Sequence, residues 1–472
     1  MRTQVLIIGA GVTGTGLARD LAMRGVACMV VEKQDVNAGA SGGNHGLLHS
    51  GARYVASDPA AAGECRTENQ ILKRTAAHCI EDTGGFFVAV AGDNEGYIAD
   101  FPEHCRRCGI PTQPVDLNIA REMEPALSDQ IIAVFAVDDA AVDPFKLAFD
   151  NMADARRLGA GFKRFCRVTG FDVTKGRIQR VRVRDVTTGQ TKSITAEVIV
   201  NATGAWAGEV AGLAGIPMGM RYAKGSLLVA QQRLTQRVIN RLRPPTDGDI
   251  LVPGGTVSIL GTTSERVRDP DVIYPEIHEV DAIIDAGAAI IPALAHTRFI
   301  RAYCGVRPLP KADPSTVGNG NDRAVSRGFV LIDHARQTPK ISNLVTITGG
   351  KLTTYRLMAE KAADWVCRRL GVTAACQTRC VPLPDSVEAR WTEPGLAPHL
   401  WLRNSRPDDM LLCECEMVPQ SVVEQIVAGI EQLDGRPTLE AVGLRSRIGK
   451  GPCQGTFCSQ RVAAYLYDQA HL

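Results

Sequence analysis

The sequence predicts an α/β protein with a Rossmann-like nucleotide-binding domain, a second domain built on an antiparallel sheet, and a small C-terminal cysteine-rich domain. Three observations support this. A strand, a glycine-rich turn and a helix open the chain in VLIIGAGVTGTGLARDLAMRG, strand-like runs such as Ser226–Ala230 and Val257–Leu260 lie in its middle, and four cysteines gather near its end. A chain of 472 residues is also too long for one hydrophobic core, so two or three domains are expected.

The N-terminal glycines form a G-x-G-x-x-G pattern directly after the apolar strand Val5–Ile8. Gly9 permits the tight turn, Gly11 lets the backbone approach a pyrophosphate, and Gly14 packs the helix on the strand. The free N–H groups at the start of the helix then face the anion. The alternative, an ordinary strand-turn-helix without a ligand, lacks the further signal described next.

That further signal is an acidic residue at the end of the second predicted strand. The strand Ala27–Val31 ends at Glu32, where a carboxylate accepts hydrogen bonds from a ribose diol. An acid at this point favours an unphosphorylated adenosine ribose, as in FAD or NAD, over NADP.

Two later segments favour FAD over NAD. The buried strand in VIVNATGAWA ends at Thr203 and Gly204, a pattern typical of two-domain flavoproteins. The strand Leu344–Thr348 is followed by Gly349 and Gly350 and then by a helix to about residue 366. The N-terminus of that helix can stabilise negative charge on a reduced flavin ring. We therefore expect a discontinuous FAD domain.

The four C-terminal cysteines have the spacing of a metal site. They are Cys413 and Cys415, one residue apart, and Cys453 and Cys458, four residues apart. A C-x-C arm is shorter than zinc sites usually show and suits a [2Fe–2S] cluster, in which four thiolates bind two irons. A structural zinc site and unliganded core cysteines are the alternatives.

The residues around these cysteines allow further expectations. Gly449, Gly451 and Gly455 let backbone N–H groups turn toward cluster sulfurs. The basic residues of this segment either favour the reduced cluster by their charge or form a solvated face; they are Arg445, Arg447 and Lys450.

Composition limits the kinds of partner and the cellular compartment that we expect. The net charge of +2 gives no reason to expect nucleic acid, and no apolar run is long enough to span a bilayer. A strand that begins within a few residues of Met1 leaves no room for a signal peptide. Fourteen cysteines in such a chain indicate reduced thiols. We expect a cytoplasmic protein without a transmembrane segment, compatible with peripheral association at the inner face of the cell membrane.

Several longer motifs carry a family resemblance. GASGGNHGLLHSGARY, VDPFKLA, YAKGSLLV, RAYCGVRPL and ITGGKLTTYRLMAE resemble the FAD-dependent glycerol-3-phosphate dehydrogenases, most nearly the large catalytic subunits of the anaerobic enzymes. The CECE and CQGTFC segments resemble the [2Fe–2S] domain of bacterioferritin-associated ferredoxins. The resemblance implies the two-domain FAD oxidoreductase fold of the glucose and D-amino-acid oxidase type, with a [2Fe–2S] domain after it.

An anionic, phosphorylated substrate requires cationic side chains, and the motifs supply four. The resemblance implies that the matching positions line the substrate pocket; they are Arg53, Arg307, Arg327 and Lys351, with Tyr54 and Thr353 as further contacts. We predict catalytic roles for His49, Arg307 and Lys351. His49 is the predicted proton acceptor, Arg307 polarises the reacting hydroxyl, and His45 is predicted to contact the flavin.

The expected organisation has three parts. Residues 1–370 form the FAD-dependent oxidoreductase domain, with an FAD part at about 1–85, 140–215 and 330–370 and a substrate part at about 86–139 and 216–329. A proline-rich linker covers 371–408, and the [2Fe–2S] domain covers 409–472, with helices at Val418 to about Leu433 and from about Ser459.

The expected function is oxidation of sn-glycerol 3-phosphate to dihydroxyacetone phosphate, with electrons passing from FAD through the cluster to partner subunits and the quinone pool. Two alternatives remain. The same cofactors could act on another anionic hydroxy acid, polyol phosphate or opine-like amine, or the chain could be a non-catalytic redox-sensing or electron-transfer flavoprotein.

Overall fold

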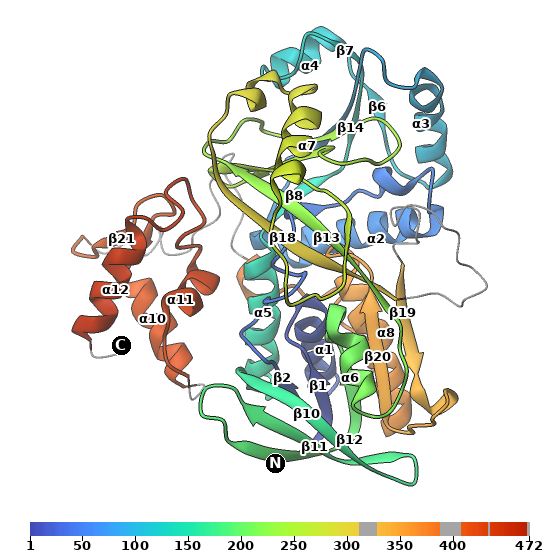
Figure 1. Cartoon of the computed structure of the whole chain (residues 1–472), viewed down its shortest axis with the longest axis vertical. Coiled ribbons are helices and arrows are strands. Elements are labelled where there is room, and N and C mark those ends of the chain that lie inside the picture. The colour runs from blue at the N-terminus through green and yellow to red at the C-terminus, as the bar shows by residue number, and fades with distance from the viewer. Residues whose placement is uncertain (311–327, 388–406, 433–434, 470–472) are drawn as a thin grey trace.

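The computed structural model describes residues 1–310, 328–387, 407–432 and 435–469. Two large sheets make up most of it, and a small helical unit at the C-terminal end lies beside them (Figure 1). The predicted α/β class with a second, largely antiparallel sheet is confirmed. The ranges assigned to the FAD part, the substrate part and the linker stay predictions, and much of the linker lies outside the described residues.

The first sheet contains five neighbouring parallel strands in the order β9–β2–β1–β12–β20. Their bounds are β1 (Arg2–Ile8), β2 (Cys28–Val31), β9 (Gly161–Lys163), β12 (Thr191–Asn201) and β20 (Leu344–Gly349). The antiparallel strands at its edges are β10 (Cys166–Thr174), β11 (Arg177–Asp185) and β19 (Phe329–Asp333). The expected strands at Val5–Ile8, Ala27–Val31 and Leu344–Thr348 are therefore confirmed.

Helices pack on the parallel strands because both faces of these strands are apolar. One face is covered by α1 (Val12–Met23), α5 (Pro144–Arg157) and α8 (Tyr355–Leu370), which share a core with β1 and β12. The other face packs against β10, β11 and α6 (Ala207–Gly212). Buried parallel strands expose their carboxyl ends at one edge of the sheet, where ligands bind in such folds.

The second sheet has the order β17–β13–β16–β15–β14–β5–β7–β6, and β18 pairs with β13. Its central strands are β13 (Met220–Ala230), β14 (Val238–Arg241), β15 (Ile250–Gly254), β16 (Val257–Gly261) and β18 (Phe299–Pro310). The others are β5 (Gly85–Val90), β6 (Gln113–Pro114), β7 (Ile131–Val137) and β17 (Glu265–Val267). All neighbouring pairs are antiparallel except β14 and β5.

Helices cover the second sheet at its far end, and short elements connect the two sheets (Figure 1). The helices are α3 (Glu95–Arg107), α4 (Leu117–Met123) and α7 (Ile277–Ala288). The connecting elements are β3 (Leu47–Leu48), β4 (Ile80–Glu81) and β8 (Ala140–Val142), with α2 (Pro59–Thr75) beside them.

The C-terminal unit has its own small core, which includes two of the four cysteines. It contains β21 (Leu411–Cys413), β22 (Val418–Pro419), α10 (Gln420–Glu431), α11 (Leu439–Ser446) and α12 (Cys458–Asp468). The helix expected from Val418 begins instead at Gln420, because Val418 pairs with Cys413 in a short hairpin and Pro419 is extended. The sequence analysis also missed α11, which is short and contains a glycine.

Candidate active site and cysteine centre

A cavity of about 340 Å³ runs from the glycine-rich turn to the junction of the two sheets. Its walls come from segments that are far apart in the sequence. They are the turn after β1, the loop 38–49, the segment 202–206, strand β18 around residues 305–309 and the turn after β20 at 347–352. The three strand-to-glycine turns, after β1, β12 and β20, therefore converge on one cavity.

The glycine-rich turn has no space for side chains. Gly9 has a φ of +106°, and a Cβ atom there would lie 2.7 Å from the Ala202 carbonyl oxygen. A Cβ on Gly11 would lie 3.0 Å from Ser41 Oγ. Gly14 does not line the cavity; its missing side chain lets α1 pass within contact distance of the Gly9 carbonyl. Gly9 and Gly11 therefore shape the cavity, whereas Gly14 allows the helix to pack.

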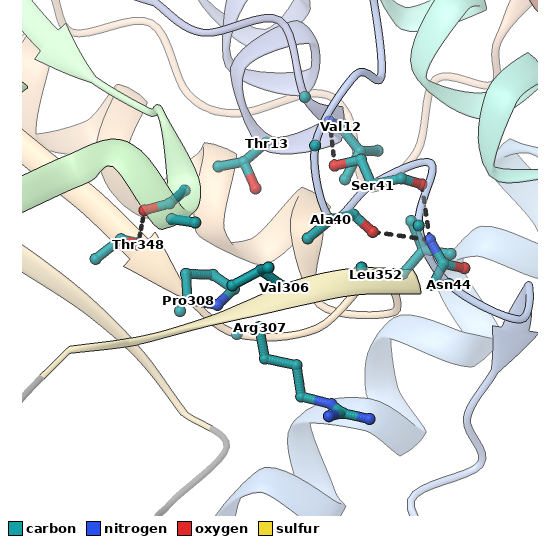
Figure 2. Close-up of a pocket in the computed structure, with 18 of the residues that line it drawn as sticks. Val12, Thr13, Ala40, Ser41, Asn44, Val306, Arg307, Pro308, Thr348 and Leu352 are labelled. Atoms are coloured by element: carbon teal, nitrogen blue, oxygen red, sulfur yellow. Dashed lines mark hydrogen bonds between the residues drawn. The ribbon is translucent and has the colours of Figure 1, made fainter. Parts of the chain in front are cut away.

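Ser41 and Asn44 complete this end of the cavity, and the sequence analysis did not single them out. The backbone N–H of Val12, at the start of α1, donates to Ser41 Oγ at 3.0 Å (Figure 2). The Asn44 amide donates to the Ala40 and Ser41 carbonyls at 3.1 and 2.7 Å, which holds the loop closed on itself (Figure 2). The available signal was the polar, glycine-rich composition of GASGGNHG.

Glu32 lies at the end of β2 in the cavity wall, as predicted. Its carboxylate accepts hydrogen bonds from the backbone N–H groups of Ala10 and Gln34, both at 2.9 Å. Burial raises its pKa, and these two hydrogen bonds oppose the rise. The two bonds fix the orientation of the carboxylate toward the space that a ribose would fill.

The turns after β12 and β20 close another wall. Thr203, Gly204, Gly349 and Gly350 all line the cavity. Thr348 Oγ1 donates to the Gly204 carbonyl at 3.0 Å, which ties the two turns together (Figure 2). The helix that follows, α8, begins at Tyr355, so its N-terminus lies near this wall.

Arg53 is held by an acidic partner at the other end of the cavity. Its Nη2 atom donates to Asp249 Oδ2 at 2.8 Å, and the Asp249 side chain has no exposed surface. The Arg53 Nη1 atom is buried and has no hydrogen-bond partner among the described residues. One face of the guanidinium is thus fixed by the protein, and the other is available to an anionic ligand.

Arg307 extends from the side of β18 opposite its neighbours Val306 and Pro308 (Figure 2). Its guanidinium donates to the Thr263 carbonyl at 3.1 Å and to the Thr262 hydroxyl. Burial, together with the positive charges of Arg307 and Arg53, lowers the pKa of His45 to about 3. His45 is therefore a neutral imidazole near two cations, and its buried Nδ1 has no partner among the described residues.

His49 lies next to Tyr54 and Lys351. Its Nε2 is 3.3 Å from the Tyr54 hydroxyl, and Lys351 Nζ lies 4.5 Å from the centre of the Tyr54 ring. The His49 backbone N–H donates to Thr353 Oγ1 at 3.0 Å. Thr353 is fully buried and does not line the cavity, so its position does not support the predicted substrate contact. It instead positions His49.

The structure thus brings together most of the predicted site residues. His45, His49, Arg53, Tyr54, Arg307 and Lys351 all line one region of the cavity. Arg327 lies outside the described residues, so its role stays a prediction. Sequence reasoning missed Asp249, which pairs with Arg53 and stands in the segment DILVPGG.

The four predicted metal-ligating cysteines lie together in the C-terminal unit. Contacts link Cys413 with Cys458, Cys458 with Cys453, and Cys453 with Cys415. Burial raises the pKa of Cys413 to about 12. Burial also opposes ionisation of Cys453, but the Gly455 and Phe457 N–H groups and two neighbouring thiols outweigh it and lower the pKa.

Backbone N–H groups face the cysteine sulfurs, as expected from the glycines. The Gly449 N–H points to Cys458 and the Gly455 N–H to Cys453. Both glycines have a positive φ, at +81° and +92°. A Cβ on Gly451 would lie 2.7 Å from Cys415 Cβ, so only glycine fits there. Such donors stabilise thiolates, the form in which cysteine binds metal.

The cavity also fits a dinucleotide cofactor by its own chemistry. It has a glycine cradle at a helix N-terminus, an oriented carboxylate at the end of β2, and a buried polar atom, His45 Nδ1, that lacks a partner in the described chain. The phosphates, the ribose diol and the polar edge of a flavin supply the complementary groups.

Comparison with known proteins identifies the family of the chain. Residues 4–365 match the family of FAD dependent oxidoreductases known as DAO. The chain is 42% identical to the A subunit of anaerobic glycerol-3-phosphate dehydrogenase from Escherichia coli K12, over 98% of this chain and 88% of that protein. It is 40% identical to the A1 subunit of the enzyme of the same name from Haloferax volcanii, over 98% and 83%.

Solved structures with the same fold include two proteins named for glycerol phosphates. The glycerol-3-phosphate dehydrogenase of Bacillus halodurans, complexed with FAD, aligns with a TM-score of 0.62 at 19% identity, over 96% of this chain and 76% of that one. The L-alpha-glycerophosphate oxidase of Mycoplasma pneumoniae, with FAD bound, aligns with a TM-score of 0.64 at 18% identity, over 81% and 99%. The chain therefore belongs to the FAD-dependent oxidoreductases of the DAO type, in the family of the A subunits of anaerobic glycerol-3-phosphate dehydrogenases.

Proposed function

We propose that this protein is an FAD-dependent dehydrogenase that oxidises sn-glycerol 3-phosphate to dihydroxyacetone phosphate and releases the electrons through a [2Fe–2S] cluster. The observation that carries the substrate assignment is the group of cations around His49. Arg53, Arg307 and Lys351 come from three separate segments and line one end of the cavity. Cations in this number at a buried site indicate a substrate with more than one negative charge.

Each side chain has a separate role in the proposed reaction. When bound, FAD accepts the carbinol hydrogen of the substrate as a hydride. We assign the phosphate to Arg53 and Lys351, because Arg53 is already oriented by Asp249 and its donor Nη1 has no partner among the described residues. Arg307 polarises the reacting hydroxyl oxygen, and His49 accepts the hydroxyl proton, so that a ketone leaves the site.

Tyr54 and His45 support these roles. The Tyr54 hydroxyl contacts His49 Nε2, and its ring lies against Lys351, so it fixes the two relative to each other. His45 stays neutral because it is buried near two cations, and can therefore contact the flavin without adding charge. Predicted contacts of Arg327 with the substrate complete the proposal.

The four cysteines are proposed to hold the [2Fe–2S] cluster. Two features support iron over zinc: the C-x-C arm and an electron donor in the same chain. The relatives are named as the A subunits of their enzymes, which supports partner subunits that carry the electrons on toward the quinone pool. Within the described part of the chain, every helix is too short or too polar to cross a membrane.

Anaerobic titration of the purified protein with glycerol 3-phosphate tests the substrate. The flavin absorbance should bleach on addition of the substrate and return on addition of an artificial acceptor. Bleaching by a different anionic hydroxy acid or amine, but not by glycerol 3-phosphate, would contradict the substrate assignment. A flavin that no such compound bleaches would favour a redox-sensing or electron-transfer protein instead.

A further inference from the structure

The basic residues before Cys453 are Arg445, Arg447 and Lys450, and they do not form a solvated face. They contact the part of the chain that forms the first sheet and its helices, which we call the FAD-binding half. Figure 1 shows the C-terminal helices beside α5, and α11 contacts α5 directly. We call the residues of this contact the docking face. On the FAD-binding half they are Asp35, Asp143, Phe145, Phe149 and Arg164, and on the C-terminal unit Glu416, Arg445, Arg447 and Lys450.

Asp35 is the centre of one buried ionic group in the docking face. Arg445 donates to both of its carboxylate oxygens at 2.9 Å, and Arg164 donates to one of them at 2.9 Å. The side chains of all three are at most 7% exposed. The Arg445 guanidinium also lies 4.8 Å from the centre of the Phe149 ring on α5. Asp35 stands on the loop between Glu32 and Ala38, which both line the cavity.

Arg447 links the cysteine site to α5. Its Nε donates to Glu416 at 2.8 Å, and its Nη1 donates to Asp143 at 2.7 Å. Glu416 directly follows Cys415. Asp143 caps α5 by accepting from the backbone N–H groups of Phe145 and Lys146. The Arg447 guanidinium thus connects Glu416, next to Cys415, with the N-terminus of α5, and α5 packs on α1.

Phe145 continues the contact to the cavity wall. Lys450 Nζ lies 4.1 Å from the centre of the Phe145 ring. A Cβ on Gly42 would lie 3.1 Å from the same ring. Gly42 precedes Gly43, Asn44 and His45, which line the cavity. The Phe145 ring and the Gly42 backbone therefore connect Lys450 to the cavity wall.

We propose that the docking face holds the four-cysteine site against the wall of the flavin cavity, so that Arg445 and Arg447 are positioning residues for electron transfer within one chain. This inference rests on the proposed function. Each transfer oxidises the reduced flavin by one electron and reduces one ferric iron of the cluster. Electron transfer slows steeply as two centres separate. A fixed contact between the two halves therefore favours transfer by keeping the flavin and the cluster at a constant distance.

The chemistry of the docking face fits such a role. Burying charged groups is costly, and a buried ion pair adds less stability than an apolar contact of the same size. Paired charges do fix one relative orientation, because a shifted interface would separate Asp35 from Arg445 and Asp143 from Arg447 and leave these buried charges less completely paired. The charged contact therefore selects a single docked arrangement.

The full-length protein with its cofactors allows a test with variants of the positioning residues. We compare the wild type with R445Q/R447Q and with the control R461Q, since Arg461 pairs with Glu414 inside the C-terminal unit and does not reach the docking face. Hydrogen–deuterium exchange of residues 140–157 and 435–458 reports docking. Stopped-flow absorbance separates bleaching of the flavin from reduction of the cluster.

The expected result has three parts. The double variant shows faster exchange in both segments, a flavin bleaching rate within about twofold of the wild type, and cluster reduction slower by roughly tenfold or more, the scale on which small displacements of reacting groups lower rates. R461Q behaves as the wild type in all three. If the double variant loses flavin, the milder R445K and R447K variants replace it.

Unchanged exchange and unchanged cluster reduction in R445Q/R447Q would overturn the proposal, as would an equal effect of R461Q. Failure of the proposed function looks different. In that case the wild-type flavin does not bleach with glycerol 3-phosphate, or the cysteines hold no iron, while the exchange comparison still reports whether the docking face holds the two halves together.

Discussion

At the scale of single residues, the cations of the site differ in what holds them. Arg53 is fixed by the buried carboxylate of Asp249, Arg307 by Thr262 and Thr263, and Lys351 lies against the ring of Tyr54. An ion pair that leaves one donor unused orients a guanidinium before substrate arrives, which lowers the entropic cost of binding. The sequence motifs identified these cations but not the neighbouring residues that orient them.

Replacing Asp249 tests this orientation. In D249N the carboxylate that holds Arg53 becomes a neutral amide, so the hydrogen bond to the guanidinium weakens and Arg53 is less well oriented. We expect the KM for glycerol 3-phosphate to rise roughly tenfold, with a smaller change in kcat, in steady-state assays with an artificial acceptor. The matched control is D93N, which breaks the similarly buried pair of Asp93 with Arg241. An equal rise of KM in D93N would contradict the assignment.

The two histidines are expected to differ in their pH behaviour. With a pKa of about 3, His45 stays neutral throughout the assay range, because its folded value lies far below the usual 6.5. H45N should therefore leave the pH profile of flavin reduction unchanged in shape, whereas H49Q should slow reduction by on the order of 10²-fold.

The same pKa also has a consequence for stability. Between pH 6.5 and about 3 the unfolded chain binds a proton at His45 that the folded chain does not, so stability falls as the pH falls in this window. H45N should lack that contribution, which melting temperatures at pH 7 and pH 5 would detect. A rate of flavin reduction that falls in H45N as far as is expected for H49Q would exchange the two roles.

At the scale of elements, the cavity exists because three turns approach one another without side chains. The turn after β1 meets the turn after β12, where Gly9 faces the Ala202 carbonyl, and the loop 38–49 meets β18, where a Cβ on Gly43 would lie 2.9 Å from Gly305 Cα. At both places a side chain would clash, so glycine is required. The sequence pattern alone indicates this requirement only for the turn after β1.

Substituting Gly9 should separate the effect of a steric clash from the effect of a strained backbone conformation. G9A places a Cβ 2.7 Å from the Ala202 oxygen on a residue with φ of +106°, so the turn must move and FAD should be lost. The matched control is G25A, since Gly25 also has a positive φ, +75°, but a Cβ there meets nothing within 4 Å. The ratio of flavin to protein after purification measures the effect. Full FAD retention in G9A would contradict the close-approach argument.

At the scale of the whole molecule, the cysteine site and the flavin cavity lie in separate units that ionic contacts join. The C-terminal unit has its own core and contacts the FAD-binding half through α11 and the segment that leads to Cys453. This arrangement suits a chain that takes two electrons from a substrate at one centre and gives them up singly at another.

Metal analysis of the whole protein tests that arrangement. We expect about two irons and two acid-labile sulfides per chain for a [2Fe–2S] cluster. C413S should lower both while leaving the flavin content unchanged, because Cys413 belongs to the core of the C-terminal unit and not to the cavity. Stoichiometric zinc with no labile sulfide would show a structural metal site instead.

The sequence by itself determined the fold class, the glycine-rich turn, Glu32, the cysteine quartet and most of the cations, because each depends on a short local pattern or on motifs shared by a family. The tertiary structure decided what depends on residues distant in sequence. It placed Asp249 behind Arg53, Thr353 behind His49, and Asp35 and Asp143 against Arg445 and Arg447. A run of basic residues has the same appearance in a sequence whether it meets water or a buried carboxylate, and only the packing of the folded chain distinguishes the two.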